Sequence, residues 1–354
     1  MIGIDLFAGV GGMSLGAKYS EIKVISAIEN DLWAAQTHSF NFKETEVFCE
    51  DIRKISGSDL FNGKRSEPLI IFGGPPCKGF STSNQKTRTL NNPSNWLFTE
   101  YIRIIREIRP DWVVFENVKG ILETEQGIFL NHVIEELRAA NYKLDYKVLN
   151  AVDFGVPQTR SRLFIIGTLD KTCEISFPEP TVSRPVTVSE AIFDLPVLSV
   201  GANINELSYK CDPISHYAKQ LRGELTKSTN HLVTRNAPSV VERYKHIPQA
   251  GNWENIPENL MKNYKDRSRC HTGIYYRLKE TAPSVVIGNY RKNMLIHPTE
   301  DRGLSVREAA RLQSFPDWFE FKGSIGFQQQ QVGNAVPPLL AKAVFDSIKN
   351  SLKM

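Results

Sequence analysis

The chain has 354 residues, of which 41% are hydrophobic and 23% are charged, and its formal net charge is +4. It is long enough to bury one large core and a second, smaller one, and no apolar run reaches the roughly 18 residues that a membrane helix needs. The N-terminus lacks the basic flank and the apolar core of a signal peptide. We therefore expect a cytoplasmic protein without a membrane span.

Five cysteines are spread along the chain without a close pair. An odd number at this spacing argues against a disulfide framework and against a zinc knuckle. At least one of them is therefore expected to matter as a thiol. The five are Cys49, Cys77, Cys173, Cys211 and Cys270.

The first 168 residues alternate between strand patterns and helix patterns. Compact apolar or β-branched runs lie at residues 23–29, 46–52, 69–74, 111–117 and 162–169, and amphipathic helix patterns lie at 95–110 and 129–142. Strands that alternate with helices of about 10 to 15 residues indicate a parallel sheet. The sequence therefore predicts an α/β fold with a doubly wound, mostly parallel, Rossmann-like sheet.

The composition of the chain changes after residue 168. Residues 205–298 carry 15 Lys and Arg against 8 Asp and Glu, and a basic segment of this kind indicates either a polyanion partner or a solvated surface. Regular structure returns with a helix that Ser305 and Glu308 cap and with a terminal amphipathic helix. We predict a catalytic domain at 1–174, a smaller inserted domain at 175–300 and a return to the catalytic domain at 301–354.

A glycine-rich turn, "DLFAGVGG" (residues 5–12), follows the first strand. Such a turn either binds a nucleotide-like cofactor or is a plain structural turn. Its spacing is not GxGxxG, which disfavours a dinucleotide. Glu29 ends the next strand, where a carboxylate can accept from two ribose hydroxyls, and Asp51 follows the third, where it can accept from an adenine amino group. This combination favours S-adenosylmethionine.

The stretch "GGPPCKGFS" places Cys77 on a loop at the end of another strand. The prolines fix the turn, and Lys78 favours the reactive thiolate. Glu116, in "FENV", ends the next strand, where burial would raise its pKa and let it donate a proton to a substrate nitrogen; the alternative is a helix-capping carboxylate. Arg160 and Arg162 are two residues apart at a strand start, so both should face one side, toward a carbonyl oxygen and a phosphate, unless they are ordinary surface arginines.

The sequence resembles the bacterial DNA (cytosine-5)-methyltransferases of restriction–modification systems. Eight blocks carry the resemblance in the family's usual order: "DLFAGVGGMSLG", "ENDLWAAQTH", "EDI", "GGPPCKGFS", "FENVKGIL", "FGVPQTRSRLFIIG", "RGLSVREAARLQSFPDWFEF" and "QVGNAVPPLLAKAV". Together they span nearly the whole chain except residues 175–300. The order of the eight blocks is far more specific than any one of them.

The resemblance implies methyl transfer from S-adenosylmethionine to C5 of a cytosine that is flipped out of double-stranded DNA, with S-adenosylhomocysteine as the product and without a metal. In this family Cys77 matches the nucleophile that adds to C6, and Glu116 matches the group at N3 and the exocyclic amine. Arg162 matches the residue that holds the O2 carbonyl, and Arg160 the one that orients the site and a phosphate.

The same matching gives a cofactor site at the glycine turn. Phe7 would stack on the adenine, Glu29 would hold the ribose, and residues from the C-terminal block would reach the pocket. The matched positions are Asp5, Phe7, Gly9, Val10, Gly11, Gly12, Glu29, Asn30, Asp51, Ile52, Pro76, Leu97, Asn334 and Val336.

The resemblance also implies a lid at residues 78–95, which closes over the flipped base, and a target-recognition role for residues 175–300. Lys78 stands where the family usually has glutamine, and the stretch "APSVV" (residues 282–286) has valine where a threonine is common. We expect a monomer that acts on the DNA of a prokaryote or a phage, at the nucleoid, with a possible cognate restriction endonuclease. The recognised DNA sequence is not readable from one chain.

Three alternative functions would each leave a different mark in the sequence. A tRNA cytosine-5 methyltransferase of the same fold usually has other residues after Pro-Pro-Cys and a Cys-Phe-Thr tripeptide in the insert, and neither occurs here. An inactive binding module would lack the cysteine or the glutamate. A nicotinamide-dependent dehydrogenase is disfavoured by the glycine spacing.

Overall fold

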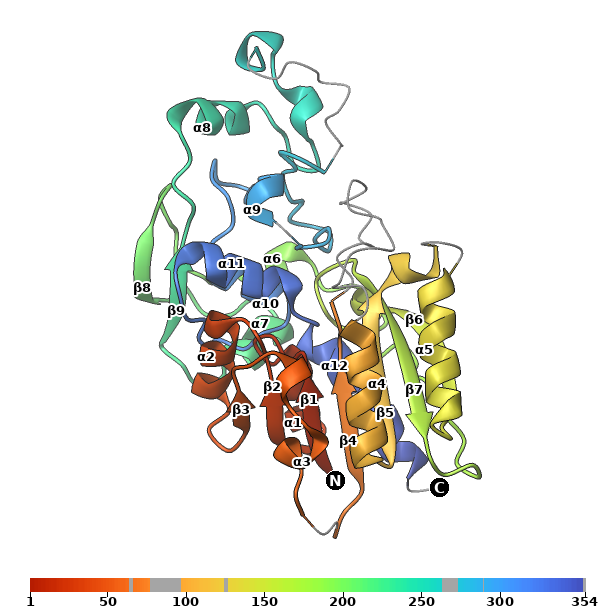
Figure 1. Cartoon of the computed structure of the whole chain (residues 1–354). Helices are drawn as coiled ribbons and strands as arrows, with labels where there is room; N and C mark the ends of the chain where they lie inside the picture. Colours follow the sequence, from red (N-terminus) through yellow and green to blue (C-terminus); the bar gives the residue numbers. More distant parts are fainter. Residues whose placement is uncertain (64–65, 77–96, 124–126, 263–272, 289, 353–354) are drawn as a thin grey trace. The chain divides into compact units, whose positions relative to one another are not determined.

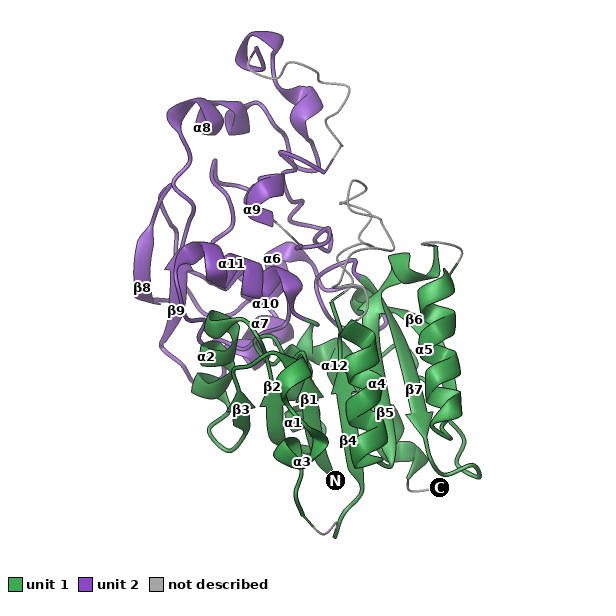
Figure 2. Ribbon diagram, in the orientation of Figure 1, with its two compact units in different colours: residues 1–154, 161–181, 336–354 green, residues 155–160, 182–335 purple. Residues whose placement is uncertain are grey.

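The computed structural model describes residues 1–63, 66–76, 97–123, 127–262, 273–288 and 290–352. The chain forms two compact units, which are described separately below (Figure 2). The first unit comprises residues 1–154, 161–181 and 336–354, and the second comprises residues 155–160 and 182–335. Within the described ranges, no helix is both long and apolar enough to cross a membrane.

The first unit is built on a seven-stranded sheet with the order β3-β2-β1-β4-β5-β7-β6 (Figure 1). All pairs from β3 to β5 are parallel, whereas β7 is antiparallel to both of its neighbours. The predicted doubly wound, mostly parallel sheet is confirmed. The strands are β1 (Ile2–Leu6), β2 (Lys23–Ile28), β3 (Glu46–Phe48), β4 (Leu69–Gly73), β5 (Trp112–Val118), β6 (Lys143–Asn150) and β7 (Ser161–Thr168).

Helices cover both faces of this sheet. Ile71 and Phe72 are successive residues of β4 and therefore point to opposite faces: Ile71 joins the core beneath α4 and α5, and Phe72 packs edge-on against Phe345 of α12, with ring centroids 4.9 Å apart. Figure 1 shows α4 and α5 side by side across one face. The helices are α1 (Gly12–Tyr19), α2 (Leu32–Asn41), α3 (Gly57–Leu60), α4 (Leu97–Ile108), α5 (Ile128–Ala139) and α12 (Pro338–Ser351).

Most of the elements predicted for this unit are present. The helix pattern at 95–110 forms α4, whose Tyr101, Ile104 and Ile105 are fully buried as their spacing predicts. The run at 46–52 is a strand only as far as Phe48, because Asp51 caps a short 3₁₀ helix over Ile52–Lys54 instead of continuing the strand. The sequence analysis missed β6 and the reversed direction of β7.

The second unit contains a two-stranded antiparallel sheet and short helices. Its centre is α10, whose seven residues are all buried and which begins with the predicted capping box of Ser305 and Glu308. A second apolar cluster surrounds Tyr244 and Tyr275. The elements are α6 (Val188–Ile192), β8 (Asn203–Ser208), α7 (His216–Arg222), β9 (Lys227–Leu232), α8 (Pro238–Lys245), α9 (Tyr290–Asn293), α10 (Val306–Leu312) and α11 (Ile325–Asn334).

The compact units divide the chain at other residues than the predicted domains 1–174, 175–300 and 301–354. Residues 301–335 belong to the second unit because α10 packs against α6, β9 and α11. Residues 155–160 also belong to it, because the backbone of Gln158 runs parallel to that of Ser284. Only the segment from Val336 onward returns to the sheet of the first unit. The target-recognition role of 175–300 stays a prediction.

Candidate active site

The turn between β1 and α1 is built on left-handed backbone. Gly9 and Gly11 have φ angles of 54° and 91°, which glycine adopts without strain, and Phe7, with a φ of 60°, is in the same left-handed region, which is uncommon for a non-glycine residue. A Cβ on Gly11 would lie 2.5 Å from the ring of Phe42 and 2.9 Å from that of His38, whereas a Cβ on Gly9 would have no described atom within 4 Å. At Gly11 the turn therefore packs against the rings of Phe42 and His38, whereas the space beside Gly9 is open and fits a nucleotide-like ligand.

The C-terminal segment closes on the same turn. A Cβ on Gly12 would collide with the backbone carbonyl of Val336, and α1 packs against α12. This close approach places Val336 at the turn, in agreement with its predicted neighbourhood. Asn334 is an exposed residue of the second unit, so its contact with a cofactor stays a prediction.

Glu29 is oriented by backbone donors. Its Oε2 accepts from the amide of Gly9 at 2.8 Å, and its Oε1 accepts from the amide of Asp31 at 2.7 Å. Burial raises the pKa of Glu29, and these two hydrogen bonds oppose the rise. Each oxygen keeps a lone pair for a further donor. This geometry suits the predicted role of accepting from ribose hydroxyls.

Asp51 already has a partner on the protein. Its Oδ1 accepts from the backbone amide of Arg53 at 3.0 Å and from Arg53 Nε at 2.9 Å. Hydrogen bonds from the Arg53 side chain lower the pKa of Asp51 to about 2. Ile52 beside it is buried. The predicted contact of Asp51 with an adenine amino group would have to be made beside this ion pair.

Three other predicted cofactor residues lie at the carboxyl ends of strands or at the start of a helix. Asn30 follows β2 and is exposed, Pro76 follows β4, and Leu97 is the first residue of α4; the last two are half-buried. Because β2 and β4 are parallel to β1, their ends meet at the edge that carries the glycine turn.

The turn after β4 is fixed against β5. Gly73 pairs with Phe115 in the sheet, and the side-chain amide of Asn117 donates to the carbonyl of Pro75 at 3.1 Å. The chain therefore leaves the sheet beside the end of β5, in the direction of Cys77. Cys77 itself and the predicted lid at 78–95 lie outside the described residues.

Glu116 and Arg162 form a buried ion pair. Arg162 Nε lies 3.0 Å from Glu116 Oε1, and the two side chains are only 13% and 10% exposed. They come from neighbouring antiparallel strands, where Glu116 pairs with Phe164 and Val118 with Arg162. Burial lowers the pKa of Arg162, and the charge of Glu116 opposes this. The structure thus brings two predicted catalytic groups together.

The other oxygen of Glu116 lies over Gly74. A Cβ on Gly74 would be 2.5 Å from Glu116 Oε2. The glycine before Pro75 therefore leaves the space that this carboxylate occupies. This contact joins the turn that leads to Cys77 directly to the acid of the site.

Arg160 has a different environment from the one expected. It precedes β7 and belongs to the second unit, so the prediction that it shares a strand face with Arg162 is wrong. Its buried guanidinium donates to the carbonyls of Gly333 at 3.1 Å and Ala335 at 3.0 Å, and more weakly to Ile287 at 3.4 Å. Carbonyls at the end of a helix such as α11 lack intrahelical donors, and Arg160 supplies them. A contact between Arg160 and a substrate phosphate stays a prediction.

Two further residues escaped the sequence analysis. Gln158 is fully buried, accepts from the amide of Ile287 at 2.9 Å and donates to Gln313 Oε1 at 2.8 Å. Asn117 holds the turn at Pro75. Asn117 follows Glu116 directly and Gln158 lies two positions before Arg160, but their partners lie 42 to 155 positions away, so no local pattern indicates them.

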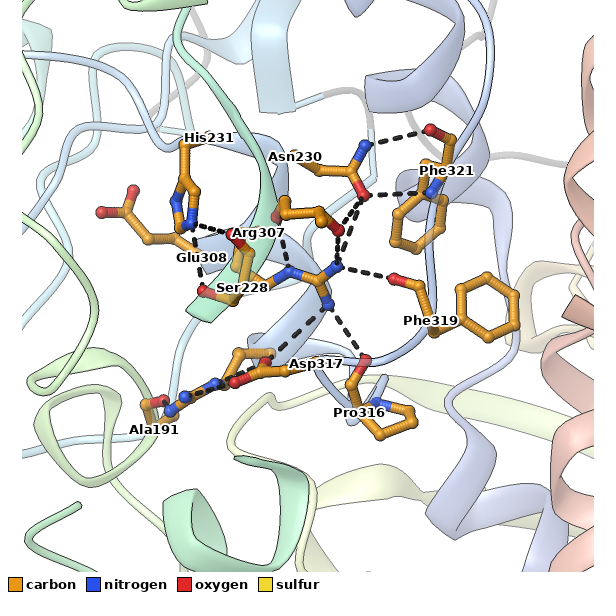
Figure 3. A network of polar contacts seen from close by, with 12 residues as sticks. Ala191, Ser228, Asn230, His231, Arg307, Glu308, Pro316, Asp317, Phe319 and Phe321 are labelled. Atoms are coloured by element: carbon orange, nitrogen blue, oxygen red, sulfur yellow. Dashed lines mark hydrogen bonds and ion pairs between the residues drawn. The ribbon is translucent and has the colours of Figure 1, made fainter. Parts of the chain in front are cut away.

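A buried polar network organises the second unit (Figure 3). The guanidinium of Arg307 donates to the carbonyls of Thr229, Pro316 and Phe319 at 2.9, 3.0 and 2.6 Å. One turn later, Arg311 pairs with Asp194 and Asp317, each at 2.7 Å. The network ties β9 and the chain after α6 to α10. It explains how a polar segment without apolar periodicity is held in place.

The comparison with known families identifies the family to which the chain belongs. Residues 1–350 match the sequence model described as C-5 cytosine-specific DNA methylase. The chain belongs to this family of DNA methylases.

Individual members of the DNA methylase family resemble the chain over nearly its full length. The type II methyltransferase M1.HphI of Haemophilus parahaemolyticus is 36% identical over 348 residues, which cover 98% of this chain and 86% of the relative. The type II methyltransferase M.DdeI of Desulfomicrobium norvegicum is 35% identical over 98% of this chain and 88% of its own length. The predicted family and enzyme class are confirmed.

Solved structures of methyltransferases share the fold. A DNA modification methyltransferase encoded within an E. coli prophage superposes with a TM-score of 0.81 at 27% identity, and the match covers 100% of both chains. A methyltransferase of Entamoeba histolytica, at 14% identity and a TM-score of 0.65, agrees in fold alone. The enzyme is thus a cytosine-5 DNA methyltransferase on a Rossmann-like sheet.

Proposed function

We propose that this chain uses S-adenosylmethionine to methylate one cytosine within a short double-stranded DNA sequence, with Cys77 as the nucleophile. The observation that carries the proposal is the Glu116–Arg162 pair. Arg162 Nε lies 3.0 Å from Glu116 Oε1, and both side chains are buried. Glu116 also lies against Gly74, which belongs to the turn that leads to Cys77. A carboxylate and a guanidinium placed together suit the N3 side and the O2 side of a cytosine ring.

The residues of the glycine turn fit S-adenosylmethionine. The open cradle at Gly9 lets a ligand approach the backbone, and the fixed carboxylate of Glu29 suits a ribose. When bound, this cofactor supplies an electrophilic methyl group and leaves as S-adenosylhomocysteine. The other residues proposed to line it are Asp5, Phe7, Val10, Gly11, Gly12, Asn30, Asp51, Ile52, Pro76, Leu97, Asn334 and Val336.

The chemistry needs a covalent step because C5 of cytosine is a poor nucleophile. The Cys77 thiolate adds to C6, and the electron pair of the C5–C6 double bond becomes available at C5. Glu116, in its protonated form, donates its proton to N3, and Arg162 donates to the O2 carbonyl, so that both stabilise the negative charge that develops on the ring. After C5 has taken the methyl group, its proton leaves to solvent and the C6–sulfur bond breaks, which restores the Cys77 thiolate.

DNA recognition is assigned to the second unit. Its basic side chains would neutralise phosphates and position the duplex, while a few others would read base edges. The Arg307 and Arg311 network supports this role because it fastens β9 and Asp317 to α10. We also propose that residues 78–95 close over the extruded base.

The proposal extends to the cell. Similarity to type II methyltransferases favours an enzyme that protects cytoplasmic, nucleoid DNA against a cognate restriction endonuclease, and we propose that it acts as a monomer. No metal takes part in the proposed chemistry. A tRNA substrate is the alternative, and competition between tRNA and duplex DNA separates the two.

Trapping on 5-fluorocytosine DNA tests the mechanism, since a fluorine at C5 cannot leave as a proton and the adduct therefore persists. We expect the wild-type chain with S-adenosylmethionine to form an adduct with DNA containing its target sequence that survives denaturation. Cys77→Ala should form none and still bind S-adenosylmethionine, while Cys49→Ala, which removes an exposed cysteine, should behave as the wild type. An adduct with Cys77→Ala would disprove the assigned nucleophile.

A further inference from the structure

The buried side-chain amide of Gln158 joins segments of the second unit that are distant in sequence. Its Oε1 atom accepts from the backbone amide of Ile287 at 2.9 Å. Its Nε2 atom donates to the carbonyl of Leu312 at 3.1 Å and to Gln313 Oε1 at 2.8 Å. Both glutamines are fully buried. Because buried amides are costly unless they are paired, these contacts fix the position of Gln158 relative to the other segments.

The backbone around Gln158 is held as well. The amide of Thr159 donates to the carbonyl of Ser284, and the amide of Ser284 donates to the carbonyl of Pro157, each at 2.9 Å. The two segments therefore run side by side in parallel. The chain then continues into β7, of which Arg162 is the second residue. The position of the Gln158 segment thus sets where the strand with Arg162 begins.

A second link leads from Gln158 to the segment after α11. Gln313, the partner of Gln158, donates through Nε2 to the carbonyl of Val332 at 2.7 Å and more weakly to that of Ala335 at 3.4 Å. Arg160 Nη2 donates to the same carbonyl of Ala335 at 3.0 Å. Since Arg160 lies two positions after Gln158, these contacts close a ring.

The ring lies where the chain leaves the second unit. The chain passes into the first unit between residues 160 and 161 and again between residues 335 and 336. Arg162, assigned to the base, lies just beyond the first crossing. Val336, whose carbonyl borders Gly12 of the glycine turn, lies just beyond the second. The ring therefore connects the residue for the base with a residue beside the cofactor turn.

We propose that Gln158 is a positioning residue for methyl transfer, which holds the two crossings in a fixed relation so that the cytosine ring and the methyl group meet at reacting distance. The inference rests on the proposed function, in which Arg162 binds the base and Val336 borders S-adenosylmethionine. Gln158 acts through these residues and takes no part in bond making. Reacting atoms must approach to about 3–3.5 Å, and a misplacement of about 1 Å costs roughly 100-fold in rate.

The alternative is a purely structural role for Gln158. A glutamine that only stabilises the fold would lower the free energy of unfolding when replaced, but would leave the chemical step of the folded protein unchanged. Gln328 is the matched control. It is 6% exposed, accepts from Asn230 Nδ2 at 3.0 Å and donates to the carbonyl of Gly323 at 2.8 Å. These partners belong to the second unit and are distant in sequence from both crossings.

The experiment is single-turnover methylation at saturating S-adenosylmethionine, with equilibrium binding of both ligands and denaturant unfolding measured beside it. The DNA is an unmethylated plasmid that carries the motif found by bisulfite sequencing of wild-type products. Gln158→Met should slow the single-turnover rate by roughly 10- to 100-fold and leave both dissociation constants within about threefold of the wild type. Gln328→Met should keep a rate within about twofold of the wild type, although both variants lose buried hydrogen bonds and stability.

Gln158→Glu provides a readout that a structural role does not move, and it covers the case in which Gln158→Met does not fold. The protonated carboxyl can donate to Gln313 and accept from Ile287 as the amide does, whereas the ionised form cannot donate. Burial raises the pKa of a carboxyl at such a position. Its rate relative to the wild type should therefore increase as the pH falls through that pKa. Ile287, Leu312 and Gln313 have no titrating side chain, and Arg160 stays charged.

The outcomes separate the two roles of Gln158. A single-turnover rate of Gln158→Met equal to that of Gln328→Met would overturn the inference, whatever stability is lost, as would a relative rate of Gln158→Glu that does not change with pH. Weaker ligand binding without slower chemistry would also overturn it, because Gln158 would then act on affinity. A wild-type chain that transfers no methyl group contradicts the proposed function instead.

Discussion

Glu116 is confined by two different neighbours. Arg162 holds one of its oxygens at 3.0 Å, and Gly74 leaves room for the other only because glycine has no side chain. The carboxylate is the free end of a flexible side chain, so it is the part that must yield when the space at Gly74 is filled. A side chain at position 74 should therefore change turnover and the free energy of unfolding by different amounts.

Gly74→Ala should reduce activity far more than stability. The added methyl group displaces the Glu116 carboxylate from Arg162, and a misplacement of this size costs roughly 100-fold in turnover. The fold loses only one ion pair, so the unfolding midpoint should shift little. Methyl transfer kinetics and thermal unfolding measure the two effects. The control is Gly303→Ala, whose new Cβ would be an ordinary 3.6 Å from its nearest neighbour.

Glu116→Gln should lower turnover by roughly 100-fold or more, because an amide binds the ring without stabilising the charge that develops on it. Affinity for S-adenosylmethionine should stay within about twofold of the wild type, since Glu116 is assigned to the base. Single-turnover methylation and equilibrium cofactor binding provide the two values. Glu135→Gln, at a 72% exposed position, is the control, and turnover of Glu116→Gln near that of the control would contradict the assigned role.

The sequence predicted Glu116 and Arg162 as site residues because each stands at a strand end or start. It did not predict that they pair, nor the partners of Arg160 and Gln158. Those partners are 127 to 175 positions distant for Arg160 and 129 to 155 for Gln158. Contacts of this range depend on how the chain folds back, which a local pattern does not contain.

At the scale of elements, α1 and α12 form the joint between the two ends of the chain. Gly16 is the closest point of their contact: a Cβ there would lie 2.5 Å from the Cβ of Ala341 and 2.7 Å from the backbone nitrogen of Lys342. Because the glycine turn leads directly into α1, a movement of α1 away from α12 would also displace the residues of the proposed cofactor site.

Gly16→Val should destabilise the protein by about 2 kcal/mol, since it overfills the contact between α1 and α12 and places a β-branched residue in a helix. Cofactor affinity should fall as well. The control is Lys18→Val, which brings the same residue type to the exposed side of the same helix. Denaturant unfolding tests the prediction, and equal stability of the two variants would show that the close approach is unimportant.

The elements that were predicted differ from those that were missed in the burial pattern and the capping of their residues. The helix α4 was predicted because its buried residues follow the helical period, and α10 because Ser305 and Glu308 form a capping box. The strand β6 was missed because it lies at the edge of the sheet and most of its residues are partly or fully exposed, so no apolar alternation marks it. The direction of β7 follows from its hairpin with β6 and was lost with it.

On the scale of the whole molecule, buried ion pairs and hydrogen bonds of arginine side chains hold the second unit together more than periodic apolar residues do. Arg302, Arg307 and Arg311 are each at most 1% exposed. Buried arginines of this kind are tolerated only when every donor has an acceptor. This is why no apolar periodicity marked residues 175–300 in the sequence and why the boundaries of the compact units were not predicted.

Arg311→Met should destabilise the protein by about 3–5 kcal/mol, because it leaves Asp194 and Asp317 buried without their partner. The matched control is Arg184→Met, which breaks the exposed pair with Glu190 and should cost at most about 1 kcal/mol. Equilibrium unfolding in denaturant gives both values. Similar costs for the two variants would mean that the network does not support the second unit.

Acid should weaken the protein through the same network. Burial tends to raise the pKa of Glu308, but the charge and hydrogen bonds of Arg302 outweigh this and lower it to about 2. A lowered pKa stabilises the folded state above the ordinary value of 4.5, and this contribution is lost as the pH falls toward 2. Glu308→Gln should be less stable at pH 6 and decline less steeply below pH 4.5. Identical slopes of unfolding free energy against pH would contradict this.

We assign Cys77 as the nucleophile that adds to C6 of cytosine and so allows methylation of C5 in one short DNA sequence. Bisulfite sequencing of DNA from a methylation-tolerant host that expresses the chain tests it most directly, with Cys77→Ala as the control. We expect protected cytosines at one recurring motif with the wild type and none with the variant. Soluble wild-type protein that binds S-adenosylmethionine but protects no cytosine, or protection that persists in Cys77→Ala, would contradict it.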